Sequence, residues 1–186
     1  MSMRKLLSAG FAAIALLAGP AAAQEPVKFG LLQDFTAVYT FVTGEYNQGQ
    51  RDYLTLVNEE GGIDGTTFEA IVRDTGNQPQ RGIEAYNRAR DEGAILFDFL
   101  STPVSRAIVP SALQDKVVMI TPVHGRGDAS DGETFPYVFP VMATYWSQAA
   151  ILAKWIEDNG GLDGKKIALV HLSLIHISEP TRLRRI

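Results

Sequence analysis

The feature that most constrains the fold is a strand, turn, helix and strand pattern between residues 94 and 125. Residues 94–100 (AILFDFL) form a nearly continuous apolar run, typical of a strand buried on both faces of a parallel sheet. The run ends in Ser101, Thr102 and Pro103. A hydroxyl residue followed by proline predicts that a helix begins here. A second apolar run, residues 117–120, leads into the polar loop 121–125, so both loops are expected at one edge of the sheet.

The same alternation of strand and helix patterns occupies the chain before this stretch. Residues 27–32 (VKFGLL) and 67–72 predict two earlier strands, each followed by a polar loop and a helical pattern. A chain that alternates in this way forms a parallel sheet with helices on both faces and right-handed crossovers. The predicted fold class is therefore α/β.

The spacing of apolar residues gives the expected helix faces. A first helix is expected after Gly44, with Tyr46 and Tyr53 on its buried side. A second helix is expected to begin at Pro79 and to end at Gly93. Pro110 falls inside the third helical pattern and predicts a kink or a break there.

The last third of the chain suggests a second lobe. Residues 135–140 (FPYVFP) predict an extended, proline-bounded crossing, followed by a helix over 143–158 and a strand over 166–170. The turn GGLDG at 160–164 repeats the turn GGIDG at 61–65. We therefore expect a lobe of the same topology to begin near residue 143, of which only the first helix and strand are present.

Charge, cysteine content and the N-terminus limit the function classes. The net charge is −4 and the body of the chain has no long basic run, which argues against nucleic acid as a partner. The absence of cysteine excludes disulfides, thiol catalysis and thiolate metal sites. Residues 1–23 combine Arg4 and Lys5 with an apolar stretch and an alanine triplet, the pattern of a signal peptide. We expect an exported protein.

The polar loops predict a small-molecule site rather than an active site. Ligands of open α/β sheets bind at the carboxyl ends of the strands, and a helix N-terminus there favours an anion. The chain lacks a Gly-x-Ser-x-Gly elbow, a Gly-x-Gly-x-x-Gly turn and a phosphate loop, so no enzyme activity and no cofactor are expected. The acidic residues of 128–133 lack the spacing of a calcium loop, so no metal site is expected. His124 either contacts the ligand or faces solvent.

Several landmarks together resemble one family of transport proteins. They are FGLL at 29–32, the turn at 58–65, Ser101 with Thr102, ITP at 120–122, FPYVF at 135–139 and IALVH at 167–171. In order and spacing they are similar to the branched-chain amino-acid-binding (type I) family of periplasmic solute-binding proteins of ABC importers. The resemblance covers residues 27–171. It implies two α/β lobes that close on a small solute at a hinged cleft and deliver it to a permease in the inner membrane. It also implies a monomer in the periplasm.

The resemblance implies a set of site residues. Ser101 and Thr102 match the residues whose hydroxyl and backbone N–H hold the ligand carboxylate. Val123 and Gly125 match donors on the adjacent loop, and Tyr39 lies in the loop that supplies an aromatic or apolar wall. Gly125 has no hydroxyl where amino-acid binders commonly offer Ser or Thr, so an aromatic acid, an amide or another carboxylate stays open as the solute beside an amino acid.

The expected organisation is a signal peptide (1–23), an N-terminal ligand-binding lobe (24–139), the start of a second lobe (140–171) and a tail (172–186). The tail looks like the translation of a sequencing-library adapter and is expected to be non-native. With a single lobe we expect weak binding and aggregation. Two alternatives stay open: the ligand-sensing domain of a receptor or amide-responsive regulator with the same fold, and an exported α/β hydrolase.

Overall fold

A computed structural model describes residues 24–122, 125, 127, 130–166 and 168. The expected signal peptide and the expected non-native tail lie outside these residues, as do Val123 and His124. The chain divides into two compact units, the first ending at Trp146 and the second beginning at Ser147. Each unit is described by itself.

The described elements alternate between strand and helix along most of the chain. The strands are β1 (Val27–Gln33), β2 (Phe68–Asp74), β3 (Ala94–Phe99), β4 (Val118–Thr121) and β5 (Val138–Pro140). The helices are α1 (Thr40–Glu59), α2 (Pro79–Asp91), α3 (Thr102–Asp115) and α4 (Tyr145–Asp158).

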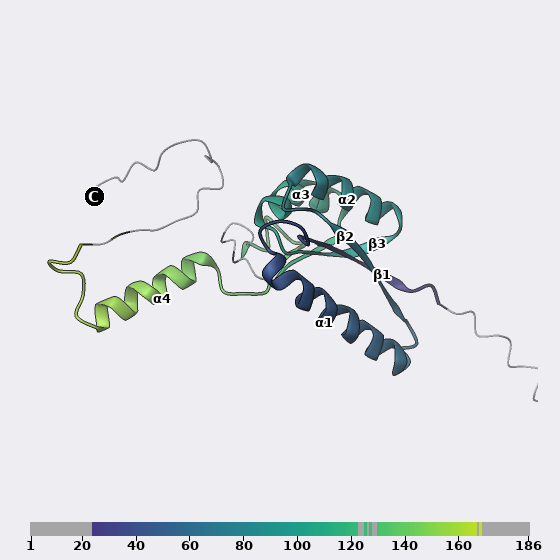
Figure 1. Ribbon diagram of the computed structural model, residues 1–186, viewed down its shortest axis with the longest axis horizontal. Coiled ribbons are helices and arrows are strands. Elements are labelled where there is room, and N and C mark those ends of the chain that lie inside the picture. Colours follow the sequence, from purple (N-terminus) through teal and green to yellow (C-terminus); the bar gives the residue numbers. More distant parts are fainter. Residues whose placement is uncertain (1–23, 123–124, 126, 128–129, 167, 169–186) are drawn as a thin grey trace, which may run out of the picture. The chain divides into compact units, whose positions relative to one another are not determined.

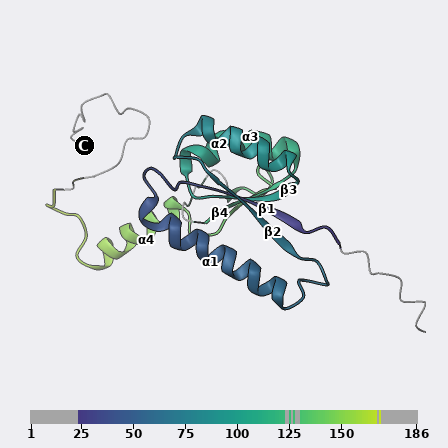
Figure 2. The same ribbon diagram turned by 45° about the vertical axis from the view of Figure 1, so that its right-hand side comes forward.

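The five strands form one parallel sheet in the order β2-β1-β3-β4-β5. Helix α1 lies on one face of the sheet, and α2 and α3 lie side by side on the other (Figures 1 and 2). The predicted α/β class and the parallel sheet with helices on both faces are therefore confirmed.

The main hydrophobic core fills the space between the sheet and the α2–α3 layer. Tyr86 of α2, Phe97 of β3 and Ile108 of α3 are fully buried in it. The rings of Tyr86 and Phe97 lie 4.7 Å apart, centroid to centroid. Gly82 lets α2 approach α3 closely, because a Cβ at this position would collide with the side chain of Val104. The second helix was expected to begin at Pro79 and to end at Gly93, and α2 (Pro79–Asp91) confirms it.

The interface between α1 and the sheet is polar. Asp98 of β3 is 2% exposed and accepts hydrogen bonds from Gln33 Nε2 (3.0 Å), Tyr46 OH (2.8 Å) and Gln50 Nε2 (3.1 Å). Asn47 Nδ2 donates to Gln33 Oε1 at 3.1 Å. Burial raises the pKa of the Asp98 carboxyl, and the three hydrogen bonds oppose that rise. A buried carboxyl at a sheet–helix interface makes the position of α1 depend on these hydrogen bonds.

Two expectations for the first helix are wrong. Helix α1 begins at Thr40, ahead of Gly44, because Gly44 is tolerated inside the helix where a Cβ would meet open space. Tyr53 is 66% exposed instead of buried. It borders a hollow of about 200 Å³, walled by apolar sheet residues that include Phe29 and Ile120, which α1 leaves uncovered.

Two proline-containing segments carried separate expectations. Helix α3 runs through Pro110 without the break that was one of the two expected outcomes, and Pro110 is exposed on its surface. The segment 135–140 was expected to be extended and to cross between lobes. Its last three residues are extended as the edge strand β5, which pairs with β4 in parallel, and the crossing stays a prediction.

Helix α4 begins in the first unit and continues into the second. It carries exposed apolar side chains, including Trp146 (79% exposed) and Trp155 (61% exposed), and none of its residues is buried. Most of the strand expected over 166–170 lies outside the described residues. Among the helices of the described part of the chain, none has the length and hydrophobicity of a membrane span.

Candidate ligand-binding site

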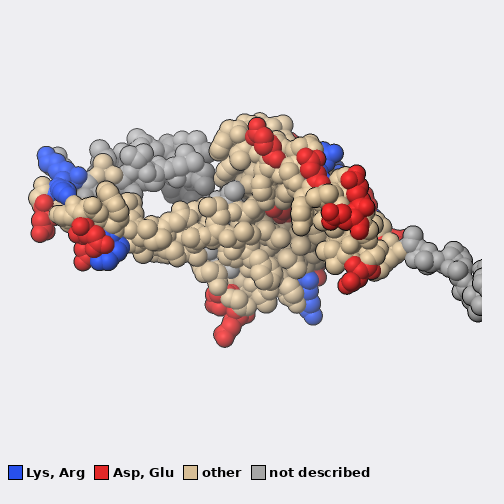
Figure 3. Space-filling model, turned by 90° about the horizontal axis from the view of Figure 1, so that it is seen from below, with Lys and Arg blue, Asp and Glu red and all other residues tan. Residues whose placement is uncertain are grey.

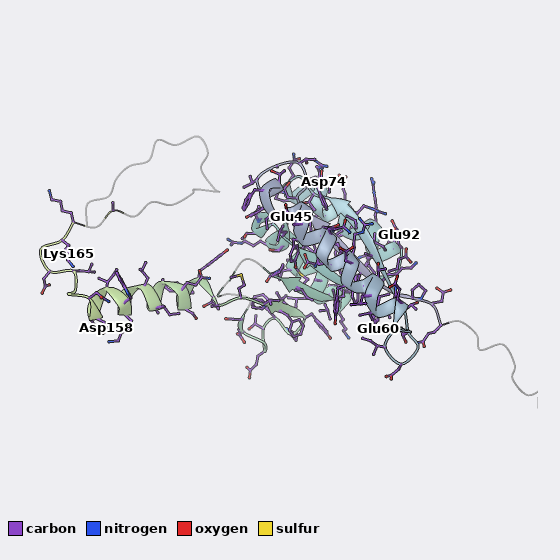
Figure 4. The ribbon with its side chains drawn as sticks, turned by 60° about the horizontal axis from the view of Figure 1, so that its bottom comes forward. Glu45, Glu60, Asp74, Glu92, Asp158 and Lys165 are labelled. Atoms are coloured by element: carbon purple, nitrogen blue, oxygen red, sulfur yellow. The ribbon has the colours of Figure 1, made fainter. Side chains whose placement is uncertain are left out.

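The loops that follow the strands meet at one edge of the sheet, because all five strands are parallel. The chain passes from β1 to β2 on one side and later returns to place β3 on the other side of β1. At such a point the loops after β1 and β3 diverge and leave a place for a ligand outside the carboxyl ends of the strands. We call this edge the carboxyl rim. Figure 4 labels Asp74 and Glu45 toward this end of the sheet, and Glu60 and Glu92 toward the opposite end.

The loop between β1 and α1 is organised by Asp34. This fully buried carboxylate accepts hydrogen bonds from three backbone N–H groups, those of Thr36 (3.2 Å), Ala37 (2.8 Å) and Tyr39 (2.9 Å). Tyr39 precedes the first residue of α1, and its carbonyl accepts from the Thr43 amide (3.0 Å) and hydroxyl (2.8 Å). Asp34 therefore holds the backbone of Tyr39 in place and so positions its side chain.

The structure brings Tyr39 and Thr102 together. Burial raises the pKa of the Tyr39 hydroxyl, and a hydrogen bond with the Thr102 side chain opposes the rise, whereas Tyr145 and Asp34 add to it. Tyr39 is therefore a neutral phenol at neutral pH, able to donate or accept a hydrogen bond. Thr102 is half-buried, so its side chain is partly accessible.

The first turn of α3 leaves one amide donor available. Ser101 is the N-cap, and its hydroxyl accepts from the Val104 amide at 3.4 Å. The Ser105 amide donates to the Ser101 carbonyl at 2.9 Å, and Pro103 has no N–H. For the Thr102 amide, the described residues offer no acceptor. Thr102 thus presents an N–H and a hydroxyl at the positive end of the helix dipole, where an anion is stabilised.

The loop after β2 ties the neighbouring loops to each other. Asp74 accepts from the amide of Phe35 (2.9 Å), the hydroxyl of Thr36 (2.8 Å), the amide of Gly76 (3.0 Å) and the guanidinium of Arg81 (2.8 Å). Burial alone would raise the pKa of the Asp74 carboxyl, but these four donors outweigh it and the pKa is lowered. Asp74 is therefore ionised and joins the β1–α1 loop to the β2–α2 loop.

Asn77 connects the same loop to α3. Its Oδ1 accepts a hydrogen bond from the Ser101 hydroxyl at 2.6 Å, across 24 residues of sequence. Its backbone has φ = 56°, in the left-handed region that asparagine tolerates better than most residues. Ser101 is fully buried, and its hydroxyl both donates to Asn77 and accepts from Val104.

The end of β4 brings a further hydroxyl to the rim. Thr121 is 1% exposed, and its Oγ1 is the one buried side-chain oxygen or nitrogen without a hydrogen-bond partner in the part of the chain that the structure describes. Gly125 is buried, and its carbonyl accepts from the Tyr145 amide at 2.6 Å. A Cβ at Gly125 would collide with the Ala143 carbonyl, which explains why glycine occupies this position.

The structure brings together only some of the five expected site residues. Tyr39 and Thr102 interact directly, and Ser101 lies buried beneath them as the helix cap. Gly125 packs against residues 143–145, and Val123 lies outside the described residues. The ligand-binding role of all five stays a prediction.

The sequence reasoning did not single out four residues that organise the rim: Asp34, Asp74, Asn77 and Thr121. The available signal was their position, because each lies at or just beyond the predicted carboxyl end of a strand.

The rim offers neutral hydrogen-bond donors and a helix N-terminus. The described residues contain no group of three or more His, Cys, Asp or Glu side chains that could hold a metal ion. The face of the molecule in Figure 3 shows scattered acidic and basic side chains and no broad basic patch. Such a rim suits a small anion held by directed hydrogen bonds better than an extended polyanion.

Comparison with known proteins identifies the family of the chain. A sequence profile described as periplasmic binding protein matches residues 26–174. A search of curated proteins found no match.

Solved structures match the chain at its fold. A fatty acid ABC transporter substrate-binding protein from Thermomonospora curvata is 28% identical, with a TM-score of 0.66, covering 76% of this chain and 35% of that one. A branched-chain amino acid ABC transporter from Thermus thermophilus with bound valine is 19% identical, with a TM-score of 0.68, covering 74% and 36%. A solute binding protein of an ABC transporter from Rhodopseudomonas palustris BisB5, in complex with 3,4-dihydroxy benzoic acid, is 22% identical. Its TM-score is 0.57, and the match covers 73% and 37%.

The chain thus spans about a third of the length of these structures. Proteins of this kind bind solutes and are not enzymes. Because the profile covers most of the chain and the parallel sheet matches the solved structures, this chain belongs to the periplasmic binding protein family and has the fold of ABC-transporter substrate-binding proteins.

Proposed function

We propose that this chain supplies the N-terminal half of a periplasmic clamp for a small carboxylate-bearing solute, which an ABC permease then receives. The carboxylate is held at the carboxyl rim by the amide and hydroxyl of Thr102, with Tyr39 beside it. Ser101 supports the helix start, and Val123 and Gly125 are proposed as further ligand contacts. Residues 1–23 direct export, and the monomer works in the periplasm.

The observation that carries this proposal is the amide of Thr102, which has no acceptor among the residues that the structure describes. The donors of Val104 and Ser105 are occupied by Ser101, so the positive end of α3 has one amide left, and it lies on the residue that meets Tyr39. A carboxylate fits an amide and a hydroxyl on one residue, because it accepts both hydrogen bonds and its charge faces the helix dipole.

The solute class is narrowed by what the rim lacks. Gly125 offers no side-chain donor, and the Ala143 carbonyl leaves no room for one. An α-ammonium group would therefore depend on the opposite lobe, whereas an aromatic or aliphatic carboxylate needs only the rim and an apolar wall. The similar structures include a fatty acid ABC transporter substrate-binding protein and complexes with valine and with 3,4-dihydroxy benzoic acid. All three involve a carboxylate.

The test is an NMR titration of the ¹⁵N-labelled chain with valine, octanoate and 3,4-dihydroxybenzoate at constant ionic strength. Uncharged partners (octanol and 3,4-dihydroxybenzyl alcohol) serve as ligand controls. We expect saturable shifts of the Thr102 and Tyr39 amides with at least one carboxylate and none with its uncharged partner.

Substitution of the hydroxyl provides the second arm. Thr102→Val keeps the shape and the amide but removes the hydroxyl, so affinity should fall roughly 3- to 10-fold, the value of one neutral hydrogen bond. Thr55→Val on the exposed side of α1 is the matched control and should bind as the unmodified chain does. Equal binding of carboxylates and alcohols, or shifts confined to residues away from the rim, would refute the proposal.

A further inference from the structure

The contact between Asn77 and Ser101 lies beneath the residue proposed to bind the carboxylate. The Ser101 hydroxyl donates to Asn77 Oδ1 at 2.6 Å and accepts from the Val104 amide at 3.4 Å. Its proton points to Asn77, so this hydroxyl has no proton left for a ligand. A fully buried side chain with both functions in use supports its neighbours instead of contacting solute.

We infer that Asn77 is a positioning residue of the carboxylate site, acting through the Ser101 hydroxyl on the first turn of α3. This inference rests on the proposed function. Without the Asn77 acceptor, the Ser101 hydroxyl is free to rotate, and the cap on Val104 no longer has a single geometry. The amide and hydroxyl of Thr102, one residue further along, then lose their defined direction.

The backbone of Asn77 is part of the same device. Asn77 has φ = 56°, a left-handed conformation that is less strained for asparagine than for most residues. Its short side chain extends to the Ser101 hydroxyl. The turn, which follows β2, is anchored to the end of β1, because the Thr75 amide donates to the Gln33 carbonyl at 2.7 Å. The Gln78 amide in turn donates to the Thr75 carbonyl at 3.0 Å. Asn77 therefore transmits the position of the sheet edge to α3.

The experiment uses acetate as the probe, because it is the smallest carboxylate and needs only the rim. The dissociation constant is measured from the Thr102 amide shift, with chloride holding the ionic strength constant. Asn77→Gly removes the acceptor while glycine accepts the left-handed φ without strain. Lys116→Gly is the matched control, since Lys116 has φ = 57° at the far end of α3.

We expect Asn77→Gly to weaken acetate binding roughly 3- to 10-fold, with Lys116→Gly unchanged. Ser101→Ala, which also removes the cap on Val104, should weaken binding at least as much. The double variant should be no weaker than Ser101→Ala alone, because Asn77 acts only through the Ser101 hydroxyl. Asn77→Asp keeps an acceptor for the Ser101 hydroxyl. In the absence of ligand, the Thr102 amide of Asn77→Asp should therefore have the chemical shift of the unmodified chain, whereas that of Asn77→Gly should differ. If residue 77 only stabilised the fold, an acceptor at this position would not be needed to keep that shift.

The outcomes separate the two proposals. Acetate binding that is unchanged in Asn77→Gly, or losses from the two single variants that add in the double one, overturn the role of Asn77 and leave the proposed function standing. A chain whose Thr102 amide does not respond to any carboxylate overturns the proposed function, and the role of Asn77 with it.

Discussion

The substitution Gly30→Ala tests how tightly β1 packs against the core. Gly30 pairs with Phe97 across the β1–β3 ladder, and an added Cβ would lie 2.6 Å from Phe97 Cδ1 and 2.8 Å from Cε1. These separations are too short for carbon atoms, so the ring or the strand must move. The ring has no room, because it is fully buried, 4.7 Å from the ring of Tyr86 and 6.3 Å from that of Phe99.

The net effect is a difference between two terms. Overpacking of a core costs about 1–3 kcal/mol. Replacing glycine by alanine also restricts the conformations of the unfolded chain, which stabilises the folded state by about 0.4–1 kcal/mol. We therefore expect Gly30→Ala to lower the free energy of unfolding by about 1–2 kcal/mol, or roughly 4 °C in Tm per kcal/mol for a unit of this size.

Urea unfolding followed by circular dichroism measures the change. Gly49→Ala is the matched control, because Gly49 lies inside α1 with nothing within 4 Å of its added Cβ. It should raise stability by about 1 kcal/mol. Phe97→Leu removes part of the ring, so Gly30→Ala should cost less in that background. If Gly30→Ala stabilises the chain as Gly49→Ala does, the close approach of β1 and β3 is refuted.

Three further predictions concern charge and exposed surface. Burial raises the pKa of Asp98, so the folded state loses stability as pH rises above the unfolded value of about 3.9. The free energy of unfolding of Asp98→Asn should therefore rise relative to that of the unmodified chain as pH increases from 4 to 8. A constant difference in unfolding free energy between the two chains across this range would contradict the raised pKa. The pKa of Asp74 is lowered instead, so its contribution is present above about pH 3.9 and is lost as pH falls through the folded value. Asp74→Asn should therefore be destabilising at pH 7, and the loss of stability relative to the unmodified chain should shrink as pH falls below about 3.9 in the same unfolding series. Trp155→Gln removes a side chain that is 61% exposed on α4, so self-association measured by light scattering should decrease; unchanged scattering would show that α4 does not drive it.

Strands β1 to β4 and the cap of α3 could be predicted from sequence because their causes are local. Each of these strands contains a short apolar run, and the Ser101–Pro103 segment carries the capping hydroxyl and the proline that begin a helix. The start of α1 was missed because its cap, Tyr39, makes no side-chain capping hydrogen bond and leaves no sequence signal. Gly44 looks like a boundary in the sequence, yet in the structure it is an exposed helix position.

The remaining differences arise from tertiary contacts. The polar side of α1 is buried because Asp98 and Gln33 meet it from the sheet, so hydrophobic spacing pointed to the wrong face for Tyr53. At the rim, Ser101 was expected for its position after β3. Its partner Asn77 lies 24 residues away, and no spacing rule connects them. Sequence reasoning located the edge where the site is built, but not the hydrogen bonds that direct it.

The strand order has a consequence for how the sheet assembles as the chain is synthesised. β2 joins one side of β1, and β3, β4 and β5 then join the other side in the order in which they emerge. Each of β3, β4 and β5 therefore pairs with a strand that is already in place, so the sheet grows at one edge while β2 stays the other edge. The edge strand β5 has three residues and ends in Pro140, which has no amide to donate, so it is a poor template for the strand of another molecule. The edge at which the sheet grows thus ends in a strand that discourages pairing between molecules.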